Sequence, residues 1–105
     1  MNRQLTMLIV DDMEVERISF AEIFKDEYQI LEAENGKQAM EQLEQQKVHI
    51  VLLDLCMPVM DGFEVIREMK QQDKYADIPI VAKTAIDEKT EVKALEAGAD
   101  EYIFS

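Results

Sequence analysis

The sequence predicts an α/β domain in which helices cover both faces of a five-stranded, doubly wound parallel β-sheet. Short apolar segments rich in β-branched residues alternate along the chain with segments whose apolar residues recur at helical spacing. Strands that alternate with helices form parallel sheets, because right-handed crossovers return each strand in the same direction. The chain has 105 residues, which is room for one domain, residues 1–105.

The first strand is predicted over residues 6–10, whose nearly continuous apolar sequence is typical of a strand buried on both faces. A helix is predicted over residues 14–25, because apolar residues recur there at helical spacing: Val15, Ile18, Ala21 and Phe24. Residues 28–33 form a second strand, and their more polar sequence favours a place near the edge of the sheet.

The middle of the chain continues the alternation. A second helix follows the Asn35-Gly36 turn and is marked by three apolar residues: Ala39, Met40 and Leu43. Residues 48–55 form the third and most apolar strand. A third helix follows Gly62 and presents three apolar residues on one face: Phe63, Ile66 and Met69.

The last part of the chain begins with a short fourth strand over residues 79–82, which starts at a proline. Asp87 can cap a fourth helix that carries Val92 and Leu95 and stops at Gly98. Residues 101–104 begin a fifth strand. A sheet of this kind normally closes with a further helix, which is absent here, so we expect a C-terminally truncated fragment of a longer protein.

Composition narrows the classes of function. The chain has 11 basic and 23 acidic residues and a net charge of −12. So negative a surface repels nucleic acid and anionic lipid, and we expect this domain to bind neither directly. No apolar segment approaches the length of a membrane span, and the N-terminus lacks the features of a signal peptide. The single cysteine, Cys56, cannot form an internal disulfide, which favours a cytoplasmic location.

Three carboxylates stand at strand ends. Asp11 and Asp12 follow the first strand, and Asp54 lies near the end of the third. Ligands of open parallel sheets bind at that carboxyl edge. Two carboxylates about 5 Å apart repel by roughly 3 kcal/mol at an effective dielectric constant of 20, so converging acids need a cation. The oxygen ligands favour Mg²⁺ over Zn²⁺, and no sequence resembles a dedicated Ca²⁺ loop.

Each acid also has a structural explanation. Asp11 and Asp12 are placed where an acidic residue can cap the following helix. That explanation is weaker for Asp54, because a carboxylate inside an apolar strand is costly to bury without a partner. Taken together, the three acids favour a metal site.

Four segments in order, covering essentially the whole chain, resemble the receiver domains of response regulators: Val10–Asp12, Leu53–Gly62, Ile78–Ala85 and Ala97–Tyr102. The resemblance implies a flavodoxin-like sheet of strand order 2-1-3-4-5. It implies a regulatory domain rather than an enzyme. Its partners would be a histidine kinase or phosphotransfer protein and an output domain or effector.

The resemblance also assigns residues. Asp54 matches the phosphoacceptor, and Asp12 and Asp54 would bind Mg²⁺ with the backbone carbonyl of Cys56. Asp11 would act largely through water. Thr84 matches the switch hydroxyl that bonds the phosphoryl group, and Tyr102 matches the aromatic residue whose rotamer follows that hydroxyl.

Two positions depart from the family pattern. The family places a lysine seven residues after the equivalent of Gly98, where this chain has Ser105. That lysine is either replaced or lies just past this residue. Lys83, directly before Thr84, stands where an apolar residue is common. A solvated side chain is the simpler interpretation, although Lys83 could offer a cation near the site.

Two other functions compete with phosphoacceptance. A phosphatase of the haloacid-dehalogenase type also uses a strand-end aspartate and Mg²⁺, but it needs a second acid where this chain has Cys56. A pseudo-receiver would keep the fold and act as an interaction module without phosphorylation, as the missing lysine would allow. We further expect a chain without the final helix to expose apolar surface and to self-associate.

Overall fold

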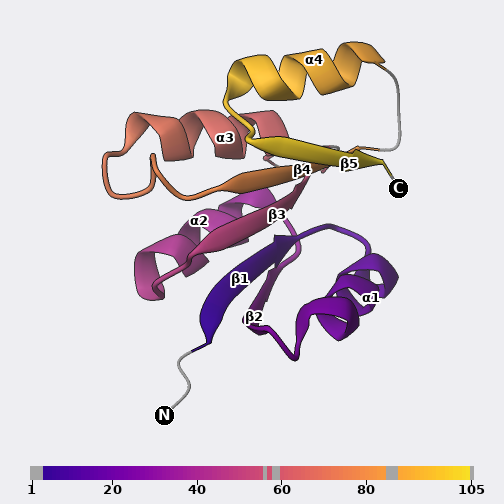
Figure 1. Cartoon of the computed structure of the whole chain (residues 1–105). Helices are drawn as coiled ribbons and strands as arrows, with labels where there is room; N and C mark the ends of the chain where they lie inside the picture. Colours follow the sequence, from indigo (N-terminus) through magenta and orange to yellow (C-terminus); the bar gives the residue numbers. More distant parts are fainter. Residues whose placement is uncertain (1–3, 56, 58–59, 85–87, 105) are drawn as a thin grey trace.

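The computed structural model describes residues 4–55, 57, 60–84 and 88–104. Five parallel strands form one sheet of order β2-β1-β3-β4-β5, as predicted (Figure 1). The strands are β1 (Leu5–Val10), β2 (Tyr28–Ala33), β3 (Ile50–Asp54), β4 (Ile80–Thr84) and β5 (Glu101–Phe104). The more polar β2 lies at an edge, which confirms its predicted place, and the described residues end with β5.

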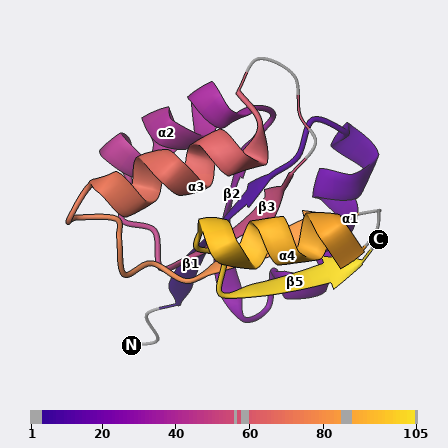
Figure 2. The ribbon, with the colours of Figure 1, turned by 90° about the horizontal axis from the view of Figure 1, so that it is seen from above.

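Four helices alternate with these strands in the described part of the chain. They are α1 (Glu14–Phe24), α2 (Gly36–Gln45), α3 (Gly62–Gln71) and α4 (Glu88–Ala97). Helices α2, α3 and α4 cover one face of the sheet, and among the described helices α1 alone covers the other (Figures 1 and 2). Gly98 ends α4 with a φ of 122°, as predicted, whereas the predicted cap Asp87 lies outside the described residues.

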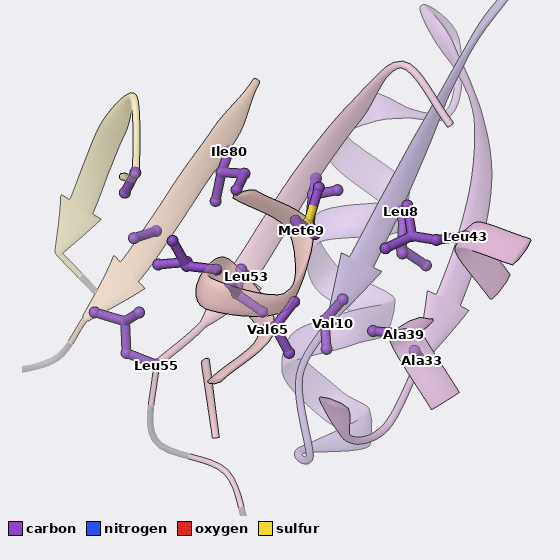
Figure 3. Packing of buried hydrophobic residues seen from close by; sticks show 14 of the residues in the cluster. Leu8, Val10, Ala33, Ala39, Leu43, Leu53, Leu55, Val65, Met69 and Ile80 are labelled. Atoms are coloured by element: carbon purple, nitrogen blue, oxygen red, sulfur yellow. The ribbon is translucent and has the colours of Figure 1, made fainter. Parts of the chain in front are cut away.

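The three-helix face carries the larger hydrophobic core. Leu53 and Ile80 point from the sheet toward this layer, where they pack with Val65 and Met69 of α3 (Figure 3). Ala39 and Leu43 of α2 pack in the same cluster. The predicted apolar face of α3 is confirmed, since Ile66 and Met69 are fully buried and Phe63 packs partly against the core.

The one-helix face is packed less completely. A smaller cluster joins Met7, Ile9 and Leu52 to the half-buried Phe20, Ala21 and Phe24 of α1. The predicted apolar face of α1 is therefore wrong in its first half, because Val15 and Ile18 are 73% and 51% exposed. Val92 and Leu95 of α4 are exposed too, whereas Ala94 of that helix is buried.

None of the helices in the described part of the chain combines the length and the apolar character that a membrane crossing requires. The bounds of β2 and β5 match the predicted ones, and those of β1, β3 and β4 differ by one or two residues at an end. Strand β4 runs to Thr84 and so includes Lys83.

Candidate metal centre at the carboxyl edge of the sheet

Strand register brings the three predicted acids together. Val10 of β1 is level with Leu53 of β3, so the residues that follow them, Asp11 and Asp54, lie side by side at the carboxyl edge. One carboxylate oxygen from each of Asp11, Asp12 and Asp54 lies within 4.8 Å of the other two. The convergence inferred from the sequence is therefore present in the fold.

Asp11 is the buried member of this cluster, with 1% of its surface exposed. Its Oδ1 accepts the backbone N–H of Met13 at 2.9 Å, which turns the chain into α1. Its Oδ2 accepts a hydrogen bond from Nζ of Lys83 at 2.7 Å. Both carboxylate oxygens thus have fixed donors, and the side chain is held in one orientation.

Asp12 and Asp54 are more open. Asp12 is exposed and Asp54 is half-buried at the last position of β3. An exposed and a half-buried carboxylate beside a third, buried one form a donor set of oxygens that water can reach. That set fits Mg²⁺, which binds through one or two carboxylates and keeps several of its waters.

Lys83 corrects an expectation from the sequence. Its side chain is not solvated: 4% of its surface is exposed. Besides Asp11, Nζ contacts the carboxylate of Glu16 on α1, and it lies 5.6 Å from the centre of the Phe20 ring. A buried ammonium needs such partners, because an unpaired charge in this environment would be strongly unfavourable.

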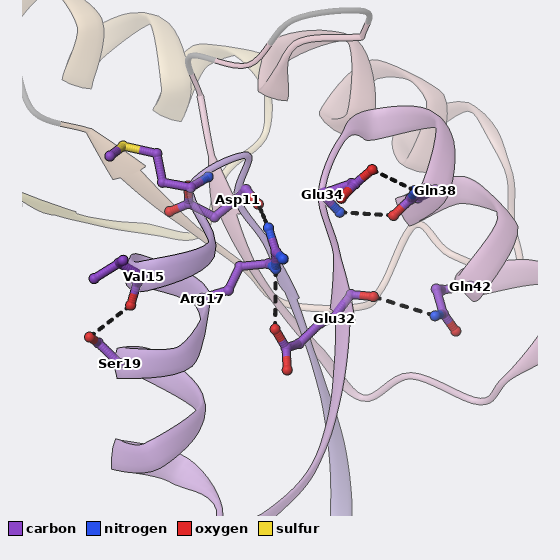
Figure 4. Close-up of polar contacts among 9 residues, drawn as sticks. Asp11, Val15, Arg17, Ser19, Glu32, Glu34, Gln38 and Gln42 are labelled. Atoms are coloured by element: carbon purple, nitrogen blue, oxygen red, sulfur yellow. Dashed lines mark hydrogen bonds and ion pairs between the residues drawn. The ribbon is translucent and has the colours of Figure 1, made fainter.

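Arg17 is a further site residue that the sequence reasoning missed. Its Nη1 donates to the backbone carbonyl of Asp11 at 2.9 Å, and its Nε pairs with Oε1 of Glu32 on β2 at 3.1 Å. Figure 4 shows Arg17 reaching from α1 between these two residues. Arg17 lies on α1, six residues after Asp11, and that spacing was the available signal.

The first residue of α3 lies close to the backbone at the end of β3. A Cβ atom on Gly62 would lie 2.5 Å from the carbonyl oxygen of Asp54 and 2.6 Å from Cα of Leu55, so no larger residue fits without a backbone shift. Asp61 caps α3, since its side chain accepts the N–H of Glu64 at 2.9 Å. The start of α3 is thereby held against the end of β3.

The other predicted site residues are placed only in part. The backbone of Thr84 ends β4 opposite Phe104, but its side chain lies outside the described part of the structure. Tyr102 is half-buried on β5 and packs against the larger core. Cys56, whose carbonyl was assigned to the metal, and Ser105 lie outside the described residues.

The fold and the acidic edge define a class of flavodoxin-like domains with a carboxylate site at the ends of β1 and β3. Comparison with known families makes this specific. The family model for the response regulator receiver domain matches residues 7–104. The chain therefore belongs to the response-regulator receiver domains, a family of regulatory domains of two-component systems, as its motifs predicted.

Curated relatives agree. The chain is 40% identical over 98 residues to the chemotaxis protein CheY of Halobacterium salinarum, covering 92% of this chain and 81% of that protein. It is 38% identical over 99 residues to the histidine kinase P4 of Formosa agariphila, covering 93% of this chain but 7% of that kinase. The chain thus spans about four fifths of one relative and a small part of the other.

Solved structures share the fold. The chemotaxis response regulator CheY4 of Vibrio cholerae superposes with a TM-score of 0.92 at 24% identity, over 98% of this chain and 88% of that one. The receiver domain of a sensor histidine kinase from Pseudomonas aeruginosa, with a magnesium ion coordinated in its active site cleft, superposes with a TM-score of 0.89 at 27% identity. The alignment covers 98% of this chain and 86% of that domain.

Proposed function

We propose that this receiver domain takes a phosphoryl group onto Asp54 in a two-component phosphorelay, with the help of Mg²⁺. The observation that supports the proposal most directly is the convergence of Asp11, Asp12 and Asp54 at the carboxyl edge of the sheet. The membership of the family and the magnesium-bound relative support it further.

In the proposed step, a carboxylate oxygen of Asp54 forms a bond to phosphorus of a phosphohistidine on a histidine kinase or phosphotransfer protein. The P–N bond breaks, and its electron pair stays with the histidine nitrogen. Asp12 and Asp54, with the backbone carbonyl of Cys56, would hold Mg²⁺, which neutralises charge as two anions approach. Asp11 is oriented by Met13 and Lys83 and would act on the metal through water.

The adduct adds a charge of about −2 beside the acids that remain. We propose that the Thr84 hydroxyl bonds the new phosphoryl oxygens and that Tyr102 follows it. The half-buried position of Tyr102 against the core of the three-helix face supports this role, because a rotamer change there would alter the β4–α4–β5 surface.

The partners follow from this role. They are a phosphohistidine donor and an output domain or effector, with regulation rather than turnover of a substrate as the purpose. Relatives with such outputs include a phosphate regulon transcriptional regulatory protein from Pseudomonas aeruginosa, of which the chain spans 44%. We place the domain in the cytoplasm, and the net charge of −12 supports a domain that does not itself bind nucleic acid.

The test is phosphorylation of the folded chain with a small phosphodonor such as acetyl phosphate, followed by intact-mass spectrometry. We expect one phosphoryl group in the presence of Mg²⁺, little without it, and none in Asp54→Ala. The exposed Asp26→Ala is the matched control and should be labelled like the wild type. Unchanged labelling of Asp54→Ala refutes the assignment. A wild type that takes no phosphoryl group from acetyl phosphate or from a kinase favours the pseudo-receiver instead.

A further inference from the structure

Lys83 forms a buried ion pair with one of the site's own carboxylates. Its Nζ lies 2.7 Å from Oδ2 of Asp11, and the two side chains are 5% and 2% exposed. The contact joins residues 72 positions apart, from β4 to the turn after β1. Backbone contacts fix the lysine, because its carbonyl accepts the N–H of Leu55, directly after Asp54.

We propose that Lys83 is a positioning residue that acts through Asp11 and sets the affinity of the acidic site for Mg²⁺. The inference rests on the proposed function, since it assigns Mg²⁺ to the cluster of Asp11, Asp12 and Asp54. The new element is the ammonium group of Lys83 on β4, which reduces the negative charge that Mg²⁺ meets at the site.

Charge is the first argument. Three ionised carboxylates carry −3, and Lys83 reduces this to −2 (−3 + 1), which a divalent cation balances. Glu16 also contacts the ammonium, but its side chain is 34% exposed, so solvent weakens its influence on the site. The positive charge of Lys83, held this close to the site, weakens the binding of another cation. Because the Lys83–Asp11 pair is little exposed, solvent and salt screen this repulsion only weakly.

Orientation is the second argument. Oδ1 of Asp11 accepts the N–H of Met13 and Oδ2 accepts a hydrogen bond from Lys83, so each oxygen already has a donor that competes with direct binding of a metal. The proposed function assigns direct ligation to Asp12 and Asp54. Removing the ammonium frees Oδ2 of Asp11, which gives Mg²⁺ a third carboxylate and a more negative site. The change in charge and the freed oxygen therefore both predict tighter binding of Mg²⁺ when the ammonium is removed.

The competing explanation is that the pair merely fastens α1 to the sheet. Lys83 does connect β4 to Glu16 and Phe20 of α1. A fastening role predicts that substitutions lower stability and leave the affinity for Mg²⁺ unchanged. The Mg²⁺ affinity of the folded chain therefore separates the two explanations without any measurement of phosphorylation.

The experiment measures binding of Mg²⁺ alone by isothermal titration calorimetry at fixed ionic strength. Lys83→Met removes both the charge and the hydrogen bond, Lys83→Gln removes the charge and keeps a donor, and Lys83→Arg keeps both. We expect Lys83→Met and Lys83→Gln to lower the Kd by about tenfold, and Lys83→Arg to stay within about twofold of the wild type. Circular dichroism verifies that each variant folds. If Lys83→Met does not fold, Lys83→Gln alone tests the effect of removing the charge.

The matched control is Lys25→Met at the end of α1. It changes the net charge in the same way, from −12 to −13 (−12 − 1), but Lys25 is exposed and paired with Glu22. We expect its Kd to equal that of the wild type. If Lys83→Gln and Lys83→Met bind Mg²⁺ no more tightly than Lys25→Met, Lys83 does not set the affinity and the inference is wrong.

Failure of the proposed function has a different signature. A wild type that does not bind Mg²⁺, or whose binding survives Asp12→Ala, refutes the metal site itself and the inference with it. A wild type whose binding depends on Asp12 but not on the charge of Lys83 refutes only the role of Lys83.

Discussion

The two faces of the sheet differ in what they hold. The face under α2, α3 and α4 buries one large apolar cluster, and the face under α1 buries a small one beside the charged group of Lys83, Asp11 and Glu16. In α1, whose residues are all described, none is fully buried. We infer that the three-helix face supplies most of the stability, which lets the α1 face accept a site whose like charges oppose folding.

Consecutive residues of β3 allow the sharpest test of this difference. Leu53 belongs to the larger cluster and Leu52 to the smaller one, and both are buried. We expect Leu53→Ala to lower the free energy of unfolding by about 4 kcal/mol and Leu52→Ala by about 2.5 kcal/mol, because the site under α1 can collapse more easily. Urea denaturation measures both. Equal losses would mean that the two faces contribute alike.

Two arginines on opposite faces give the second test. Arg17 of α1 binds the Asp11 carbonyl and Glu32, whereas Arg67 of α3 is exposed. We expect Arg17→Met to lower the free energy of unfolding by about 1.5 kcal/mol, because it removes a charged donor from the carbonyl of the buried Asp11. We expect Arg67→Met to change that free energy by less than about 0.5 kcal/mol. Urea denaturation of the two variants and the wild type measures both changes. A smaller loss for Arg17→Met than for Arg67→Met would show that polar contacts do not hold α1.

The third test concerns the acids themselves. Mg²⁺ at ten times its Kd should stabilise the wild type by about 1.4 kcal/mol, and Asp12→Ala should lose most of this gain. Without metal, Asp12→Ala should be more stable than the wild type by about 1 kcal/mol, because one member of a repelling cluster is gone. Thermal melts with and without Mg²⁺ measure both effects. Asp73→Ala, at an exposed position, is the control. If Mg²⁺ stabilises Asp12→Ala as much as the wild type, the metal assignment is refuted.

The order of the elements and the three acids were predictable because they depend on local pattern. Alternating apolar strands and helices fixed the parallel sheet, and acids directly after apolar strands marked the site at its carboxyl edge. Only their mutual distance, 4.8 Å or less, had to come from the three-dimensional structure.

The errors have a common physical cause, which is that the sequence does not say which face of an element is covered. Residues three apart in a helix drift by about 60° per step, so Val15 and Phe24 lie on opposite sides of α1 although they belong to one apparent series. Lys83 follows the predicted fourth strand, and the sequence interpretation gave it a solvated side chain, whereas it lies within β4. Its partners come from the turn after β1 and from α1, far away in the sequence.

The smallest expected effect concerns the exposed side of α1. Val15, Ile18 and Ile23 are exposed apolar residues on this helix, and we propose that they mediate weak association of two copies of the chain. The net charge of −12 on each copy opposes this contact, so salt should strengthen it. Val15→Glu should change the free energy of unfolding by less than about 0.5 kcal/mol, since the residue packs against little.

Sedimentation equilibrium at rising protein concentration, with and without added salt, measures the association. We expect a weak dimer of the wild type that becomes tighter in salt, and a monomer for Val15→Glu under the same conditions. Val92→Glu is the matched control, because Val92 is also exposed but lies on α4, on the other face of the sheet. If Val92→Glu weakens the dimer as much as Val15→Glu does, the contact does not run through α1. If the wild type stays monomeric in salt at every concentration, the exposed side of α1 mediates no self-association.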